Sequence, residues 1–330
     1  MIVDFQHHFT PRELFEDDPG TRRILQYDAT GAPSYTSHAL LYDLDEHVRM
    51  MDLAGIDAAV LTSGAGMCAD LERSRLVNDR AREAERRYPG RFVGLAHVHP
   101  LGGPEALREL GRCAVELGFP GVVITSEVDG RFIDAPEFEP FWEEVGRCGL
   151  FVFVHPALKL NYPQPFDAHD TARSVGREFS LILATIRLIN SGVLDRHPGL
   201  LIHMAHLGGG IASMLGRVRS YQDKEFWGTA GNPRHGQLPF RDFDDYLRER
   251  FVFDTAGFCG AIGSIRTALV ELPAERIVFA TDYPQEIRAR EAVRDFVDEV
   301  RGLGPAGERI LSGNVGLLLK DRAPVSAPTS

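Results

Sequence analysis

Eight short apolar segments, separated by stretches with helical spacing, constrain the fold of this chain more than any other feature. The apolar segments are rich in valine, isoleucine and phenylalanine and lie at 1–6, 58–63, 92–98, 121–125, 151–155, 200–205, 251–256 and 276–281. Buried strands that alternate with helices are typical of parallel sheets. Eight such units predict an α/β fold, a single (β/α)8 TIM barrel with long loops at its catalytic face.

The segments between the strands have the apolar periodicity of amphipathic helices. Representative predicted helices cover 43–54, 70–87, 104–117, 137–147, 172–193, 209–222, 241–249 and 263–271. An open doubly wound sheet is the alternative, but no G-x-G-x-x-G pattern follows the first strand. We therefore expect one barrel domain over 1–322. The last residues, 323–330, are rich in Pro, Ser, Ala and Thr and are expected to form a flexible tail.

Two predicted connections are much longer than the usual loops of a barrel. They cover 9–40, after the first strand, and 156–171, after the fifth. Both follow the carboxyl ends of strands, where barrel enzymes bind their substrates. The loops carry aromatic residues such as Tyr35 and Phe166, so each is a candidate lid over an aromatic or carboxylated ligand. Ordinary packing of these side chains against the barrel rim is the alternative.

The overall charge and the cysteines limit the partners of the protein. With 47 acidic and 36 basic residues the net charge is -11, which argues against a nucleic-acid surface or a polybasic membrane patch. No apolar stretch reaches the roughly 18 residues of a membrane-spanning helix. The cysteines, at 68, 113, 148 and 259, are scattered without a C-x-x-C pair, as in reduced cytoplasmic proteins. We expect a cytoplasmic protein that binds a small molecule.

Polar residues able to bind a metal stand at the ends of several predicted strands. They are Gln6, His7 and His8 at the first strand, His155 at the fifth, His206 at the sixth and Asp282 at the eighth. The carboxyl ends of barrel strands meet at one face, so we expect these side chains to converge there. Alternation along the first strand places Gln6 and His8 toward the barrel mouth and His7 toward the helices. His8, His155 and Asp282 would form the three-ligand set of a catalytic zinc.

Several separate motifs resemble, in their order along the chain, those of a known family. They are VDFQHHFTP at 3–11, DLDEHVRMMDLAGIDAAVL at 43–61, VHP at 154–156, LINSGVLDRHPGLLIHMAHLGGG at 188–210, FDTAG at 253–257, FATDYP at 279–284 and GNVGLLL at 313–319. On these motifs the chain resembles the amidohydrolase superfamily, in the branch that contains aminocarboxymuconate semialdehyde decarboxylase and the aromatic-acid (resorcylate-type) decarboxylases. The resemblance extends nearly from end to end.

The resemblance implies one divalent metal ion per chain, with zinc favoured and manganese as the alternative. Its ligands would include His8, His155 and Asp282, with His206 beside them as a catalytic residue. The first motif of the family normally begins with His or Glu, whereas this chain has Gln6, whose neutral amide is a weaker ligand. Gln6 is therefore a candidate weak ligand of the metal. His7 is the alternative only if a β-bulge turns its side chain inward.

The resemblance implies a non-oxidative decarboxylase of a small aromatic or unsaturated carboxylic acid. In it, Asp282 would exchange a proton with the carbon that loses the carboxylate, and His206 would orient water or polarise the substrate. The same residues suit an alternative, a metal-dependent hydrolase of a cyclic or aryl ester, lactone or amide. A third alternative is a barrel that binds a ligand without catalysis, because the usual first ligand is replaced.

Two further residues carry expectations about the site. Arg217 lies eleven residues after His206, where similar dimeric decarboxylases pass an arginine into the site of the neighbouring subunit. We expect a homodimer in which Arg217 binds the substrate carboxylate, with a plain surface arginine as the alternative. Asp254, at the end of the seventh strand, is a candidate hydrogen-bond partner of a ligating histidine or a cap of the following helix.

Overall fold

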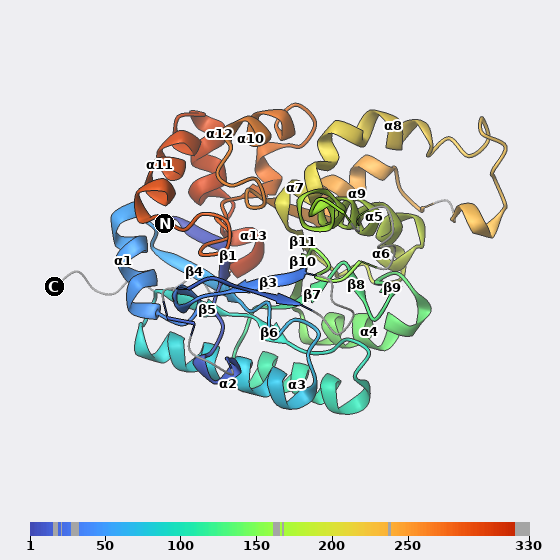
Figure 1. Cartoon of the computed structure of the whole chain (residues 1–330). Helices are drawn as coiled ribbons and strands as arrows, with labels where there is room; N and C mark the ends of the chain where they lie inside the picture. The colour runs from blue at the N-terminus through green and yellow to red at the C-terminus, as the bar shows by residue number, and fades with distance from the viewer. Residues whose placement is uncertain are drawn as a thin grey trace.

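A ring of parallel strands forms the centre of the molecule, and helices surround it (Figure 1). The computed structural model describes residues 1–15, 19–20, 22–27, 33–160, 166, 168–236 and 239–320. In spatial order the ring strands are β1 (Val3–His8), β4 (Ala58–Thr62), β5 (Phe92–Gly94), β6 (Ala96–His97), β7 (Gly121–Thr125), β10 (Phe151–His155), β11 (Ile202–Met204), β12 (Phe251–Asp254) and β13 (Ile277–Val278). Their order follows the chain, as in a (β/α)8 barrel.

Backbone hydrogen bonds close this ring. β5 pairs with β4, and β6 pairs with β7. β5 and β6 therefore form together one barrel strand, which is interrupted at Leu95. On the opposite side the segment after β13 bonds to β1. These bonds run from Phe5 N to Phe279 O at 2.9 Å, from Asp282 N to Gln6 O at 3.0 Å and from His8 N to Tyr283 O at 2.7 Å. The predicted barrel is therefore confirmed.

The first strand differs from its predicted bounds. It was expected over 1–6 but is observed over Val3–His8, because the backbones of His7 and His8 still pair with Leu61 and Thr62 of β4. The register between β1 and β4 shifts by one residue between Asp4 and His7, which is a β-bulge. The polar side chains at its end are thus carried by a strand and not by a loop.

The helices cover the outside of the barrel, and most lie close to their predicted positions. They are α1 (Leu44–Ala54), α2 (Leu71–Arg87), α3 (Gly103–Val115), α4 (Glu139–Cys148), α5 (Arg177–Asn190), α6 (Val193–Arg196), α8 (Leu215–Ser220), α9 (Phe243–Arg250), α10 (Ile262–Ala268), α11 (Arg290–Arg301), α12 (Pro305–Glu308) and α13 (Gly316–Leu319). In α1, Asp43 caps the first turn by accepting from Glu46 N, and Gly55 ends the helix at a φ of 69°.

Two predicted helices are interrupted. The helix expected over 172–193 begins with a π-helical turn at Ala172–Gly176 and becomes α-helical only in α5. The helix expected over 209–222 is preceded by α7 (His206–Gly210), which is not a regular helix because Leu207, Gly208 and Gly209 have φ values of 51°, 66° and 72°. Consecutive left-handed residues reverse the local sense of winding, so regular α-helix resumes only at α8.

A two-stranded hairpin lies within the long connection predicted over 9–40. It consists of β2 (Ile24–Tyr27) and β3 (Pro33–Ser37), which pair antiparallel. Side chains of the barrel hold β3 by its carbonyl groups: Arg177 donates to Ser34 O at 2.6 Å, and Gln285 donates to Thr36 O at 3.0 Å. A second small hairpin, β8 (Glu127–Val128) and β9 (Arg131–Phe132), follows β7. The hairpin β2–β3 therefore covers part of the barrel mouth.

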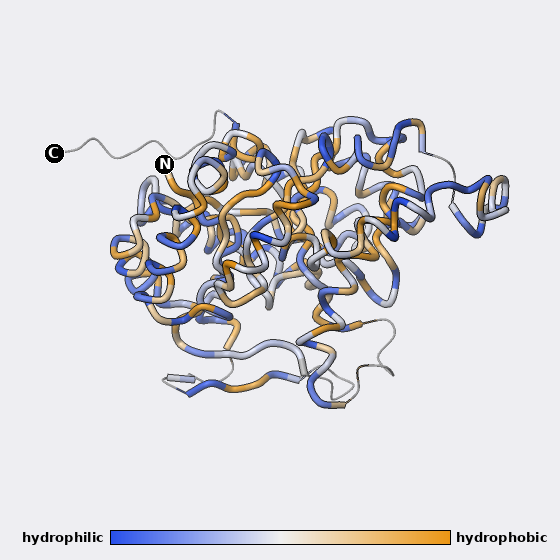
Figure 2. Tube along the Cα trace, turned by 90° about the horizontal axis from the view of Figure 1, so that it is seen from above, coloured by the Kyte–Doolittle hydropathy of each residue, from blue (hydrophilic) through white to orange (hydrophobic). Residues whose placement is uncertain are grey.

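Some expectations concern parts of the chain that lie outside the described residues. The tail over 323–330 is one of them, so the domain boundary at 322 stays a prediction. A membrane-spanning helix is absent from the part of the chain that the structure describes. The segment after α8 extends away from the barrel in two perpendicular views (Figures 1 and 2).

Candidate metal centre

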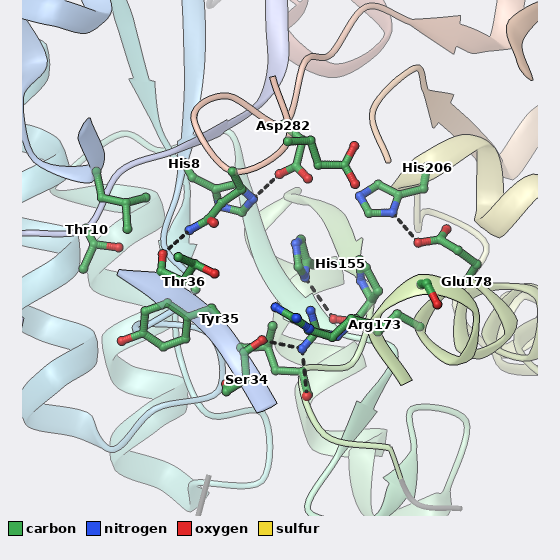
Figure 3. Close-up of a pocket in the computed structure, with 18 of the residues that line it drawn as sticks. His8, Thr10, Ser34, Tyr35, Thr36, His155, Arg173, Glu178, His206 and Asp282 are labelled. Carbon is green, nitrogen blue, oxygen red and sulfur yellow. Dashed lines mark hydrogen bonds and ion pairs between the residues drawn. The ribbon is translucent and has the colours of Figure 1, made fainter. Parts of the chain in front are cut away.

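Three potential ligands converge at the carboxyl ends of the barrel strands (Figure 3). His8 ends β1, His155 ends β10 and Asp282 follows β13. One ligand atom from each lies within 4.8 Å of the others, and all three residues are buried. His8 Nε2 is 2.5 Å from Asp282 Oδ1, and the rings of His8 and His155 meet edge to face at 5.4 Å. Two imidazoles and a carboxylate are a suitable donor set for zinc and similar divalent ions.

The outer nitrogen of each imidazole is already bonded. His155 Nδ1 donates to Pro156 O at 2.9 Å, which leaves the lone pair on Nε2. His8 Nδ1 lies 3.1 Å from Thr62 Oγ1, so its Nε2 is likewise the inward atom. Such outer hydrogen bonds fix the tautomer and ring orientation of histidine ligands.

The surroundings favour a neutral His155 and an ionised Asp282. Burial lowers the pKa of His155 well below its ordinary value, and the neighbouring His8 and His206 lower it further. Burial alone would raise the pKa of Asp282, but the charge and hydrogen bond of His8, with His206 and His155, lower it. A neutral imidazole and an ionised carboxylate are the ligand forms of these groups.

His206 lies beside this cluster and has an acidic partner. Its ring is 6.0 Å from that of His155, and its Nδ1 is 2.8 Å from Glu178 Oε1 on α5. Burial lowers the pKa of His206, but the charge and hydrogen bond of Glu178, together with Asp282, outweigh it and raise the pKa to about 10. A divalent cation beside Asp282 would act in the opposite direction, because it disfavours a second positive charge nearby.

Gln6 bridges His206 and the floor of the site. The residue is fully buried, and its Nε2 is 3.0 Å from His206 Nε2. Its Oε1 is also buried and has no hydrogen-bond donor among the described residues. An unpaired buried acceptor is costly, so the site fits a cation at this oxygen. The described side chains here thus offer two imidazoles, one carboxylate and one free amide oxygen.

His7 lies on the other side of β1 despite the bulge. Its Nδ1 is 2.9 Å from Asp4 Oδ2, and its Nε2 is 3.0 Å from His47 Nδ1 on α1. Both rings are fully buried between the barrel and α1. The bulge therefore does not turn His7 into the barrel mouth, and the alternative in which it replaces Gln6 is wrong.

Asp254 and His203 form a buried pair below the site. Asp254 Oδ2 lies 2.8 Å from His203 Nε2, and its Oδ1 accepts from the backbone nitrogens of His206 at 2.8 Å and Ala256 at 3.1 Å. Asp254 therefore holds the backbone of His206 and not the side chain of a ligating histidine. The ring of His203 stacks on Phe153 at 4.3 Å, so it is part of the core.

A cavity of about 270 Å³ opens above the three-ligand cluster. Ser34, Tyr35 and Thr36 of β3 form part of its wall, as do Arg173 and Arg177. Burial, with the charge of Arg173 nearby, lowers the pKa of Arg177 to about 10. The volume is close to the lower end of ligand pockets, roughly 300–1,000 Å³, and suits one small ring. Tyr35, from the connection over 9–40, and Asp170, from the connection over 156–171, both line this cavity. The exposed Tyr27 of the β2–β3 hairpin is not among the described wall residues.

Arg217 is not part of this cavity. It is exposed on α8, where its guanidinium lies 5.2 Å from the ring centroid of Tyr221. Within its own chain, therefore, the structure does not bring Arg217 to the candidate ligands.

Comparison with known proteins places the chain in a family. The model of the amidohydrolase family matches residues 3–301. The chain belongs to the amidohydrolase family. It is 32% identical over 308 residues to a gamma-resorcylate decarboxylase of Rhizobium radiobacter, covering 86% of this chain and 88% of the relative. It is 31% identical over 309 residues to the gamma-resorcylate decarboxylase of Rhodococcus jostii, with the same coverage.

Solved structures agree with this placement. A 2,6-dihydroxybenzoate decarboxylase complexed with 2,6-dihydroxybenzoate superposes with a TM-score of 0.78 at 25% identity, over 97% of this chain and 98% of that one. The dihydroxybenzoic acid decarboxylase of Polaromonas sp. JS666, with bound manganese and the inhibitor 2-nitroresorcinol, has the same TM-score and identity over 97% and 96%. The family resemblance expected from the motifs is therefore confirmed.

Two acidic residues of the site escaped sequence analysis. Glu178 follows a long connection and lies in a helix, so no strand end marked it. Glu286 lines the cavity four residues after Asp282, and burial and the charge of Asp282 raise its pKa to about 7. The short spacing from Asp282 is the one sequence signal that could have identified Glu286.

Proposed function

We propose that this protein is a metal-dependent decarboxylase that releases carbon dioxide non-oxidatively from a small aromatic carboxylic acid. The convergence of His8, His155 and Asp282 beneath a small cavity carries the proposal. The relative from Rhizobium radiobacter, at 32% identity, is a gamma-resorcylate decarboxylase and adds support. An aromatic acid whose carboxylate faces the cavity floor is the proposed substrate.

One divalent ion per chain is the proposed cofactor. His8, His155 and Asp282 would hold it, with Gln6 Oε1 as a weaker neutral ligand. We propose zinc as the native ion and manganese as the alternative; the Polaromonas decarboxylase has bound manganese. Such an ion would supply Lewis-acid polarisation of the substrate's oxygen atoms.

The residues of the chain divide the remaining work. Asp282 takes up a proton from water or from a hydroxyl of the substrate and delivers it to the ring carbon that carries the carboxylate, and the bond from that carbon to the carboxylate then breaks. The electron pair of the broken bond restores the aromatic ring, so the products are carbon dioxide and the ring with hydrogen in place of the carboxylate. His206 polarises the substrate beside Asp282, and Arg177 contributes positive charge to the cavity wall.

The decisive experiment combines metal analysis with product analysis. Protein purified without added metal is assayed for metal content and for carbon dioxide release from a panel of hydroxylated benzoic acids. We expect about one divalent ion per chain, lost in His8→Ala and His155→Ala, and carbon dioxide with the decarboxylated ring as products. An acid product from an ester or amide, without carbon dioxide, would favour a hydrolase instead. No metal uptake even with added zinc or manganese would favour the non-catalytic barrel.

A homodimer is a further part of the proposal. Exposed aromatic side chains follow α8, with Phe226 at 75%, Trp227 at 41% and Phe240 at 84% relative exposure. Burial of such side chains against a second copy would stabilise a dimer. Arg217, at the base of this segment, would then reach the cavity of the partner and bind the substrate carboxylate. A cytoplasmic location is also proposed, supported by the free cysteines.

Hybrid dimers test the role of Arg217. Chains with Arg217→Ala and chains with Asp282→Asn are each expected to be inactive alone. Mixed after dissociation, they should regain activity, because one site of each hybrid combines Asp282 of one chain with Arg217 of the other. Inactive hybrids, or an active Arg217→Ala homodimer, would contradict this role. Light scattering on the same samples measures the oligomeric state.

A further inference from the structure

We propose that Glu178 is a positioning residue for the metal centre: through His206, it turns the amide of Gln6 so that the carbonyl oxygen faces the metal ligands. The inference rests on the proposed metal site. An amide carries one oxygen and one nitrogen, and these exchange places when the group rotates by half a turn. Only one of the two orientations therefore presents the oxygen of Gln6 to a metal ion.

Three side chains form a continuous line from α5 to β1. Glu178 Oε1 is 2.8 Å from His206 Nδ1, and His206 Nε2 is 3.0 Å from Gln6 Nε2. Gln6 and His206 are buried, at 0% and 5% relative exposure, so water does not compete freely for these bonds. At the far end of the line, Gln6 Oε1 is buried without a donor among the described residues.

The direction of each bond follows from what each atom can do. An ionised carboxylate only accepts, so Glu178 requires the hydrogen of His206 on Nδ1. With a divalent ion at the site, which disfavours a second positive charge nearby, the ring is neutral and its lone pair stays on Nε2, which accepts from the amide nitrogen of Gln6. The amide orientation in the structure is the one this arrangement requires. The oxygen is left pointing away from His206, where only a cation or a donor can satisfy it.

The fold brings Glu178 close enough for this role. The loop that carries His206 passes the first turn of α5 so closely that a Cβ at Gly209 would lie 2.0 Å from Glu178 O. Gly209 also has a φ of 72°, which favours glycine. The left-handed turn after β11 thus allows the contact between His206 and Glu178.

A double-mutant cycle on metal affinity tests the proposal. The affinity for zinc is measured by competition with a chromophoric chelator for the wild type, Glu178→Gln, Gln6→Glu and the double variant. In Glu178→Gln the new amide can donate to Nδ1, which moves the ring hydrogen to Nε2 and turns the nitrogen of Gln6 toward the metal. We expect affinity to fall roughly 10–100-fold, the usual range for partners that orient ligands. Glu178→Ala carries the same prediction if Glu178→Gln does not fold.

The Gln6→Glu background distinguishes orientation from charge. A carboxylate has two equivalent oxygens, so the orientation of the side chain at position 6 does not matter in this background. The loss of zinc affinity caused by Glu178→Gln should therefore be smaller, by a factor of at least about five, than the loss that the same change causes in the protein with Gln6. Equal losses in the two backgrounds would show that Glu178 acts by charge alone and would overturn the proposal. Glu286→Gln provides the matched control: it removes a carboxylate of the same cavity whose charge acts on His206, but which accepts a hydrogen bond from Cys259 N and not from His206. An equal loss there would also overturn it.

Failure of the underlying metal site gives a different result. If wild-type protein binds no zinc or manganese while Gln6→Glu does, the proposed native metal site is wrong and orientation by Glu178 fails with it. If wild-type protein binds zinc and Glu178→Gln binds it equally well, only the role of Glu178 is wrong.

Discussion

Two of the residues at the candidate site have an unusual backbone. His206 and Asp282 adopt φ values of 56° and 54°, in the left-handed region that side chains with a Cβ avoid. Such conformations cost about 1–2 kcal/mol each and persist only where the surroundings enforce them. Here the bonds from His206 N to Asp254 and from Asp282 N to Gln6 O fix both residues. The left-handed turns direct the two side chains toward the same cavity.

Asp282→Asn is expected to abolish turnover while it leaves the fold intact. Asparagine tolerates the left-handed region well, so the backbone at 282 is not strained further. The amide cannot serve as an anionic ligand or transfer the proton, and we expect kcat to fall roughly 10²–10⁴-fold. Steady-state carbon dioxide release and the unfolding midpoint in urea measure the two effects.

Asp129→Asn is the matched control for that variant. Asp129 has a similar φ of 51°, but it pairs with His99 at 3.2 Å and does not line the cavity above the metal ligands. Turnover of Asp129→Asn should equal that of the wild type. Wild-type activity in Asp282→Asn would contradict the assignment of Asp282.

The turn after β11 connects the site to the outer helix α5. Leu207, Gly208 and Gly209 wind in the left-handed sense, and this places α5 against the loop of His206. Gly208 also lies close to the ring of Phe253, since a Cβ there would be 2.9 Å from it. The glycines of this turn therefore serve packing as well as backbone conformation.

Gly209→Ala is expected to destabilise the protein. A Cβ there meets the carbonyl oxygen of Glu178 at 2.0 Å, and the positive φ adds about 1–2 kcal/mol. The free energy of unfolding in urea should therefore fall by at least that amount. Gly216→Ala in α8 is the control, because nothing lies within 4 Å of its Cβ and alanine favours a helix by about 0.5–1 kcal/mol. Equal stability of the two variants would show that the turn can relax.

Sequence patterns predicted the elements that depend on local periodicity. The strands that end at His8 and His155, the strand that precedes Asp282, and their convergence all follow from apolar runs and barrel topology. The bounds of β1 differ from the prediction because polar residues continue its pairing with β4. Glu178 was missed because its contact with His206 joins residues from different elements across a close backbone approach. The position of Arg217 relative to a second subunit lies beyond what a single chain determines.

Buried histidines are a property of the molecule as a whole. His38, His47, His97 and His155 are all buried, and burial is the largest cause that lowers the pKa of each. The pKa of His97 falls to about 4, although its bond to Leu95 O acts in the opposite direction. His97 also accepts from Ser63 N at 2.9 Å, so its neutral form supports the loop after β4. Protonation of these buried histidines at acidic pH should therefore destabilise the folded protein.

The metal-free protein is expected to lose stability as the pH falls from 6.5 to about 4. The unfolded chain binds a proton at His97 below pH 6.5, whereas the folded chain does so only near 4, so stability is present above this window and lost within it. Each such group contributes a slope of up to about 1.4 kcal/mol per pH unit. Urea unfolding across this range should show a shallower slope in His97→Gln than in the wild type. His235→Gln, at an exposed site, should leave the slope unchanged.

The β2–β3 hairpin is attached to the barrel through its backbone, whereas its side chains line the cavity. Arg177 donates a hydrogen bond to the backbone carbonyl of Ser34, and Gln285 donates one to that of Thr36. Every residue type has such a backbone carbonyl. The side chains at positions 34 to 36 can therefore be substituted while these two hydrogen bonds to the hairpin are kept. Selection for a new aromatic acid could act on Tyr35 and its neighbours while the anchorage is inherited unchanged. Substrate preference and the attachment of the hairpin can therefore change independently of one another.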